Sequence, residues 1–193
     1  MATLALWVVL SCWAAFAICL AVNHVRVRRR RGAEKGRDQK GELRAPESML
    51  GLAIEGIAVA LVFTQPESWP KVSHVAAAAA MLLSTGSVAL LAAALRHLGR
   101  HWRIKAVVTE DHELVTTGPY SVVRHPVLLS LFALTVASGL LLAPPGRLVA
   151  AVALYIAGTE IRVRAEERLL RRRFGAAFDA YRSRVAAYLP FIR

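Results

Sequence analysis

Cysteine is scarce in this sequence. The two cysteines, Cys12 and Cys19, are seven residues apart within one apolar stretch. On a helix this spacing places them about 10 Å apart along the axis, at a rise of about 1.5 Å per residue, which is too far for a disulfide bond. We therefore expect two free thiols in apolar surroundings instead of a disulfide-stabilised fold.

Several motifs are also missing. The sequence has no G-x-G-x-x-G or Walker pattern, which excludes the soluble nucleotide-binding folds that depend on a glycine-rich phosphate loop. It has no long internal repeat. His97 and His101 have the spacing of one helix face, but a zinc site needs at least a third protein ligand. We therefore predict no metal site.

Apolar residues, in contrast, are abundant. They make up 56% of the chain, with a mean hydropathy of +0.44, which is more than one core of a domain this size can bury. A membrane-spanning helix needs about 20 apolar residues, and five segments are candidates: residues 3–22, 49–65, 72–95, 127–143 and 148–163. We predict an all-α, polytopic membrane protein with about five transmembrane helices, whose first partner is the lipid bilayer.

Acidic residues are few, 13 against 25 lysines and arginines, and the net charge is +12. The basic residues are not gathered on one face, as in a nucleic-acid-binding protein. Instead, 23 of the 25 lie in alternate connections of the predicted spans, residues 23–48, 96–126 and 162–193. This alternation is what the positive-inside rule predicts for an odd number of crossings. We expect no nucleic-acid partner, an external N-terminus and a cytosolic C-terminus, in an inner or plasma membrane.

The first apolar segment does not resemble a signal peptide. No positive charge precedes it, and a basic cluster at residues 26–31 follows it. A signal peptide carries its positive charge before the apolar region. We therefore expect the segment to remain as an uncleaved anchor, within an N-terminal half (residues 1–95) that contains three spans and a basic cytosolic loop.

Two features stand out in and after the predicted spans. Glu55 is an ionisable group inside the second span, where such a group usually has a partner or a function; a structural hydrogen bond and a functional role remain equally open. Beyond the fifth span, apolar residues recur every three or four positions, which predicts a cytosolic amphipathic helix. These residues are Leu169, Leu170, Phe174, Ala177, Phe178 and Tyr181.

The stretch TTGPYSVVRHP, residues 116–126, lies at the entry to the fourth span. Pro126 suits the first turn of a helix, and the residue before a proline favours an extended backbone. His125 should therefore stand just before the helix, where the positive end of the dipole and Arg124 together favour an anion. Gly118 and Pro119 predict a turn. The alternative is a simple turn followed by an interfacial arginine anchor.

Paired carboxylates, Glu166 and Glu167, follow the fifth span on the same predicted side. Glu167 and Arg171 are four residues apart, the spacing of a surface ion pair on a helix. Glu166 points about 100° away and does not share that partner. We therefore expect one carboxylate to face the loop before the fourth span.

HELVTTGPYSVVRHP together with EERLLRRRFGAAFDAYRSRVAAYLPFI closely resembles the integral-membrane methyltransferases typified by isoprenylcysteine carboxyl methyltransferase and the related phospholipid methyltransferases. The resemblance covers residues 95–193, about half of the chain. It implies a helical methyltransferase core in residues 96–193 that binds S-adenosylmethionine, releases S-adenosylhomocysteine and admits a lipophilic acceptor from the bilayer. Leu128 and Ser130 stand where the family usually has tyrosine and glycine, and Phe178 also replaces a tyrosine.

The resemblance also implies the site. The expected cofactor-binding residues are His112, Leu114, Val115, Gly118, Tyr120, Arg124, His125, Pro126, Glu166 and Glu167. The residues expected to act on the acceptor or the reacting atoms are Arg124, His125, Arg164 and Glu167.

The chemistry of S-adenosylmethionine agrees with this set. Arg124 suits its carboxylate, a glutamate suits its ammonium or ribose, and Tyr120 or Trp102 suits its sulfonium through a cation–π contact. A carboxylate acceptor needs no base. An amine or hydroxyl acceptor needs one, and the candidates are His125, His112 and Glu55.

Arg164 or Arg162 is a candidate to hold an anionic acceptor, although both also suit simple inner-side anchors. The acceptor itself, an isoprenylcysteine-like carboxylate or a lipid, stays open. Two further interpretations remain: a nicotinamide-dependent membrane reductase of a lipid or steroid, and a non-catalytic membrane protein with a degenerate pocket.

Overall fold

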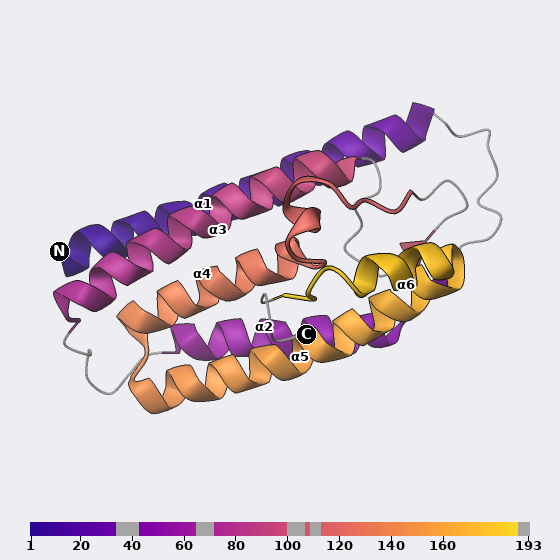
Figure 1. Cartoon of the computed structure of the whole chain (residues 1–193). Coiled ribbons are helices and arrows are strands. Elements are labelled where there is room, and N and C mark those ends of the chain that lie inside the picture. Colours follow the sequence, from indigo (N-terminus) through magenta and orange to yellow (C-terminus); the bar gives the residue numbers. More distant parts are fainter. Residues whose placement is uncertain (34–42, 65–71, 100–106, 109–112, 189–193) are drawn as a thin grey trace.

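Five long helices lie side by side along one common direction in the computed structural model (Figure 1). The structure describes residues 1–33, 43–64, 72–99, 107–108 and 113–188. The helices are α1 (Ala2–Ala33), α2 (Glu47–Phe63), α3 (His74–Leu98), α4 (Pro126–Leu142), α5 (Pro145–Phe174) and the short α6 (Ala176–Arg182). A 3-10 turn, η2 (Gly118–Ser121), precedes α4, and β1 (Leu43–Arg44) pairs antiparallel with β2 (Val107–Val108).

The described part of the chain is therefore helical, as predicted. Each of the five apolar segments corresponds to one helix, although the segments 49–65, 72–95 and 127–143 extend one or two residues beyond theirs and α1 continues well past residue 22 into the basic cluster. Among the described residues, two helices are long and apolar enough to cross a membrane, Ala2–Arg29 of α1 and His74–Leu98 of α3. Helix α4 is apolar but shorter. The number of crossings beyond these two remains a prediction.

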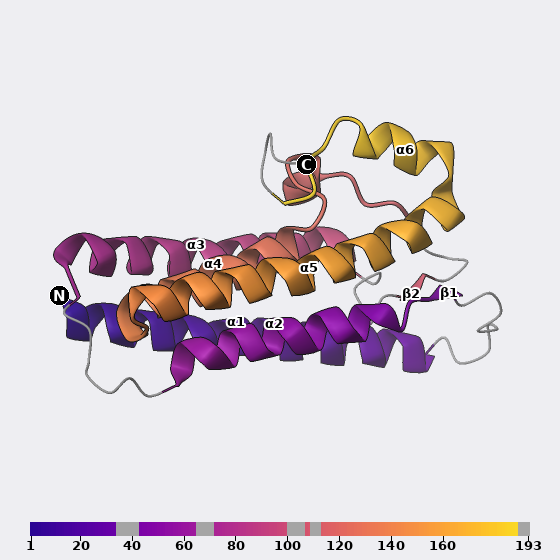
Figure 2. The same ribbon diagram turned by 90° about the horizontal axis from the view of Figure 1, so that it is seen from below.

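The helices form two groups that meet at α4. Helix α3 packs against α1 and α4, while α2 packs chiefly against α5, and both figures show this arrangement (Figures 1 and 2). Part of the α1–α3 contact is made by small side chains, with Ala5, Ala77 and Ala80 almost fully buried, and part by larger apolar side chains such as Phe16 and Leu91. Small residues let membrane helices approach closely, so that van der Waals packing holds them together where no hydrophobic effect acts between them. The bundle is held together in the way expected of membrane helices.

Helices α2 and α5 cross at an unusually short distance. A β-carbon on Gly51 would lie 2.5 Å from the carbonyl oxygen of Gly158, and one on Gly158 would lie 2.7 Å from that of Gly51. No larger residue fits at either position unless the backbones separate. The crossing brings the buried face of α2, including Glu55, directly against α5.

The prediction of one amphipathic C-terminal helix is not confirmed. Helix α5 ends at Phe174, and Gly175, with a φ of +52°, separates it from the seven-residue α6. Phe178 and Tyr181 are buried as expected, whereas Ala177 is exposed. The positive φ, which glycine adopts without strain, redirects the chain so that α6 folds back beside the end of α5 (Figure 1).

Helix directions alternate along the bundle. The C-terminal ends of α1, α3 and α5 and the N-terminal ends of α2 and α4 lie at the same end, where η2 and α6 are also found (Figures 1 and 2). We call this the η2 end. Residues from distant parts of the chain meet there.

Candidate functional site

The entry to α4 has the predicted form. Pro126 is the first residue of the helix, and His125 precedes it as the N-cap with a φ of −125° and a ψ of 59°. Arg124 and His125 are both buried, and neither points into solvent. The prediction that the imidazole stands directly before the helix is confirmed.

The loop before α4 makes the predicted turn at Gly118 and Pro119, as the 3-10 turn η2. Gly118 has a φ of +60°, and a β-carbon there would lie 2.3 Å from Nε2 of His97. His97 Nδ1 lies 3.2 Å from the Thr117 hydroxyl. Glycine is therefore required for both reasons, the backbone angle and the close approach of α3.

Directly upstream of this turn, the described chain has no regular secondary structure. Residues 113–116 form no regular element, and Leu114 and Val115 are half-buried. His112, together with His101 and Trp102, lies outside the described residues. Tyr120, in contrast, is buried within η2.

Arg124 binds Glu167 and the C-terminal tail at the same time. Its Nε and Nη2 atoms lie 2.9 and 2.8 Å from Glu167 Oε1. Its Nη1 donates to the carbonyl oxygens of Arg182, at 3.1 Å, and Val185. The guanidinium thereby joins the loop before α4, helix α5 and the segment after α6.

The C-terminal tail is also bound through backbone hydrogen bonds. The N–H groups of Arg124 and His125 donate to the carbonyls of Ala186 and Ala187, at 2.8 and 3.0 Å. The Tyr181 hydroxyl donates to the carbonyl of Tyr120 at 2.6 Å. The tail is therefore part of the site, and the predicted meeting of the loop with the C-terminal segment is observed.

His125 lies between the two glutamates. Its Nδ1 is 3.5 Å from Glu166 Oε2, and its Nε2 is 3.5 Å from Glu167 Oε1. Burial by itself lowers the pKa of His125, but the nearby hydrogen-bonding oxygens and charges of the two carboxylates outweigh this and raise the pKa. The buried imidazole therefore binds a proton more readily than a free histidine side chain does.

The carboxylates respond in the opposite direction. Burial disfavours the ionised form of both, but hydrogen bonds and charge from His125 and Arg124 lower the pKa of Glu167 to about 2. Burial also opposes the ionisation of Glu166, but the hydrogen bonds and charges of His125 and Arg162 outweigh it and lower the pKa of Glu166. Both glutamates are ionised at neutral pH.

Glu55 reaches this group of charges from α2. Its carboxylate accepts hydrogen bonds from the Thr159 hydroxyl at 2.9 Å and from Arg162 Nη1 at 3.0 Å. Arg162 Nη2 lies 3.4 Å from Glu166 Oε1. The sequence left open whether Glu55 has a structural partner or a functional role. The structure gives it partners, because Glu55 is hydrogen-bonded and ion-paired.

These contacts form one continuous network, which we call the polar cluster. It begins on α2, follows one face of α5 and ends at the entry to α4. Its members are Glu55, Arg124, His125, Arg162, Glu166 and Glu167.

In the described part of the chain, Glu167 does not pair with Arg171, although their spacing allowed a surface ion pair. Glu167 bonds to Arg124 and lies 3.5 Å from Arg182 Nε, while Arg171 lies 3.1 Å from Asp179. Neither glutamate is left free, because Glu166 also has partners, His125 and Arg162.

Arg164 is not brought to the polar cluster. Its side chain is 64% exposed and pairs with Glu160 at 2.7 Å. It does line a hollow of about 260 Å³ beside Glu167, whose other lining residues are Arg168, Arg171 and Arg182. This basic hollow adjoins the cluster through Glu167.

Thr159 and Arg182 were not singled out in the sequence. Thr159, Arg162 and Glu166 have the three- and four-residue spacing of one helix face, which is a usable signal for a polar stripe inside a predicted span. No local pattern marks Arg182. Within the described ranges, no group of three or more histidine, cysteine, aspartate or glutamate side chains is placed to hold a metal ion.

Two comparisons with known proteins match this region. Residues 77–172 match the model of the isoprenylcysteine carboxyl methyltransferase (ICMT) family. The protein-S-isoprenylcysteine O-methyltransferase of Saccharomyces cerevisiae is 36% identical over 89 residues, which is 46% of this chain and 37% of the yeast protein. The matched region thus spans little more than a third of that relative. The family match includes the entry to α4 and both glutamates of α5.

Proposed function

Because the chain belongs to the isoprenylcysteine carboxyl methyltransferase family, we propose that it transfers the methyl group of S-adenosylmethionine to a lipophilic acceptor in the membrane. The acceptor class is an isoprenylcysteine-like carboxylate or a lipid. One observation carries the proposal. Glu167 lies within 3.5 Å of both Arg124 and His125, inside the matched region, although Arg124 and Glu167 are 43 residues apart in sequence.

The residues of the site fit such a cofactor. The Glu166 side chain is 26% exposed, so an ionised carboxylate is accessible to an ammonium or a ribose hydroxyl. His125 Nε2 is buried without a hydrogen-bond partner among the described residues, which leaves a donor or acceptor position to fill. When bound, S-adenosylmethionine supplies an electrophilic methyl group on its sulfonium.

The proposed binding residues include those around the turn and those of the polar cluster. They are His112, Leu114, Val115, Gly118, Tyr120, Arg124, His125, Pro126, Glu166 and Glu167. Within this set, the bonds of Arg124 to Glu167 and to the tail support a positioning role. Arg164 and Arg182, which line the basic hollow, are better placed for an anionic group of the cofactor or acceptor.

The raised pKa of His125 favours an acceptor that is already anionic. A general base must be deprotonated to accept a proton, whereas the two glutamates raise the pKa of this imidazole. A carboxylate acceptor needs no base, and catalysis then depends on alignment and on exclusion of water. When protonated, the imidazole also adds a positive group to the site.

We further propose that all five long helices cross the membrane, with the N-terminus outside and the η2 end in the cytosol. The alternation of helix directions supports this (Figure 1), as does the placement of 23 of the 25 basic residues in the three connections that this topology places on one side. The polar cluster then lies at the cytosolic mouth of the bundle, where a soluble cofactor and a lipid-anchored acceptor can both reach it.

A thermal-shift experiment tests the cofactor. The full-length protein in detergent should melt at a higher temperature with S-adenosylhomocysteine, because a ligand that binds only the folded state stabilises it by about 2.7 kcal/mol at 100 times its Kd. NADPH should have no effect. Stabilisation by NADPH alone would support the membrane reductase and contradict the proposal.

Methyl transfer tests the acceptor. Labelled methyl groups should pass from S-adenosylmethionine to an S-farnesylcysteine derivative with a free carboxylate, but not to its methyl ester. Glu166→Gln should reduce the transfer, since it removes an accessible negative charge. Glu47→Gln, on an exposed carboxylate at the start of α2, is the matched control. Binding of S-adenosylhomocysteine without transfer to any acceptor in a lipid extract would support the non-catalytic interpretation.

A further inference from the structure

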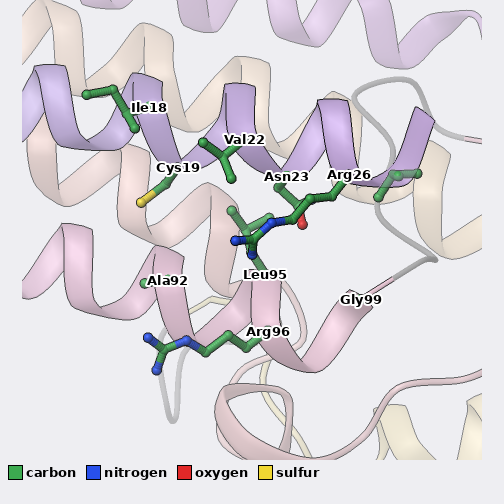
Figure 3. A pocket seen from close by; sticks show the side chains of 10 residues that line it. Ile18, Cys19, Val22, Asn23, Arg26, Ala92, Leu95, Arg96 and Gly99 are labelled. Carbon is green, nitrogen blue, oxygen red and sulfur yellow. The ribbon is translucent and has the colours of Figure 1, made fainter. Parts of the chain in front are cut away.

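A second hollow lies between α1 and α3, on the side of the bundle that α2 and α5 do not cover. It has a volume of about 540 Å³ and is lined by both helices near the η2 end (Figure 3). Its entire α1 wall lies before the region that matches the methyltransferase family, which begins at residue 77. None of its residues belongs to the polar cluster.

The lining of this hollow is divided into an apolar and a basic part. The apolar part consists of Ile18, Cys19, Val22, Val27, Ala92 and Leu95. The basic part consists of Arg26 and Arg96, and Figure 3 shows Arg26 extending from α1 toward Leu95 on α3. Both arginines are exposed, and neither has an ion pair within the part of the chain that the structure describes.

An amide group adds a third polar element. Asn23 lies between the two parts of the lining, and its Nδ2 is buried without a hydrogen-bond partner among the described residues. A buried amide without a partner costs free energy. A ligand oxygen in the hollow would satisfy it.

We propose that this hollow binds one anionic phospholipid of the leaflet at the η2 end. The phosphate lies between the guanidinium groups of Arg26 and Arg96, within reach of the Asn23 amide, and an acyl chain lies along Ile18 and Val22. The inference rests on the membrane topology proposed above, but not on methyl transfer.

The apolar wall argues for a lipid instead of a free anion. Ile18 and Val22 are 61% and 42% exposed, and a small anion would leave this surface uncovered. Anionic lipids occur at the cytosolic face, where basic residues near the surface attract them. Only an amphiphile meets the guanidinium groups and the apolar wall together.

Native mass spectrometry of the full-length protein in neutral detergent tests the proposal. Phosphatidylglycerol and phosphatidylcholine with identical acyl chains are titrated separately. The wild type should bind phosphatidylglycerol more tightly than phosphatidylcholine, by about fivefold for each arginine, which is the contribution of one basic residue near an anionic surface. The double variant Arg26→Ala with Arg96→Ala should lose this preference. Arg96→Gln alone, at an exposed position, should lose part of it.

Arg28→Ala with Arg29→Ala is the matched control, because it removes two exposed charges from the same helix outside the hollow. This variant should keep the preference. An equal loss in both double variants, or a wild type that does not distinguish the two lipids, would overturn the proposal. So would competition by inorganic phosphate at the concentration of the lipid. The readout requires no methyl transfer, so it stands or fails independently of the enzymatic activity.

Discussion

Arg124 and Glu167 show how single residues hold the site. Their side chains are 3% and 6% exposed, and such burial is tolerated for charged groups only when each charge is met. Glu167 is met by Arg124, and the remaining donors of Arg124 are met by carbonyls of the tail. The pair therefore couples the position of the C-terminal segment to that of the loop before α4.

The protonation of His125 predicts a pH dependence at this scale. Burial lowers its pKa, but Glu166 and Glu167 raise it above the ordinary value of 6.5. A raised pKa means that the charged imidazole stabilises the fold fully below pH 6.5, and that this stabilisation is lost as the pH rises through the folded-state pKa. We expect the melting temperature of the wild type to fall above neutral pH more steeply than that of His125→Gln.

The melting temperatures of both proteins are measured at about pH 5 to pH 9, a range that includes the titration of histidine. His74→Gln, at an exposed histidine at the start of α3, is the control and should keep the wild-type slope. Parallel curves for the wild type and His125→Gln would show that the imidazole does not gain a proton in the folded state.

The crossing of α2 and α5 is the decisive contact between elements. Gly51 and Gly158 bring the two backbones together, and four positions after Gly51 the carboxylate of Glu55 meets Thr159 and Arg162. Thr159 and Arg162 follow Gly158 directly on α5. The small residues thus determine whether the buried ion pair can form.

Gly158→Ala should therefore destabilise the protein. A β-carbon at this position would lie 2.7 Å from the carbonyl of Gly51, and overpacking of a tight contact costs about 1–3 kcal/mol. Gly56→Ala on α2 is the control, since a β-carbon there meets nothing within 4 Å. It should be neutral or stabilising by up to about 1 kcal/mol, the difference in helix propensity. Equilibrium unfolding in mixed micelles compares the two; an equal change would contradict the close crossing.

At the scale of the whole molecule, helix direction and charge agree. The η2 end contains the C-terminal ends of α1, α3 and α5 (Figure 1), and the basic residues that follow these helices make this end positive. The opposite end carries only short connections with few charges. The proposed orientation, with the η2 end in the cytosol, therefore agrees with the positive-inside rule.

Cysteine labelling in intact cells tests this orientation. In a background with Cys12→Ser and Cys19→Ser, a membrane-impermeant maleimide should label Ser73→Cys, before α3, without permeabilisation. It should label Ser183→Cys, after α6, only once the membrane is opened. Ser183 and Ser73 are both exposed, so access is set by the membrane alone. The reverse pattern would invert the proposed topology.

Much of the architecture follows from local sequence. Apolar length predicted the positions of the five helices, and Pro126 predicted both the start of α4 and the place of His125. These features depend on neighbouring residues, whose effects on the backbone do not require the rest of the fold. The break at Gly175 is also local in origin, but the three- and four-residue apolar pattern of residues 169–181 concealed it.

The partners of the charged residues were decided by the tertiary structure alone. The spacing of Glu167 and Arg171 allowed an ion pair within one helix, but Glu167 pairs with Arg124 across 43 residues, and Glu55 meets Arg162 across 107. Helical spacing states which side chains share a face, not which other helix that face contacts. Here that choice depended on the close approach of α2 to α5 and on the tail folding back over the entry to α4, because an ion pair requires atoms within about 4 Å and sequence separation sets no such distance.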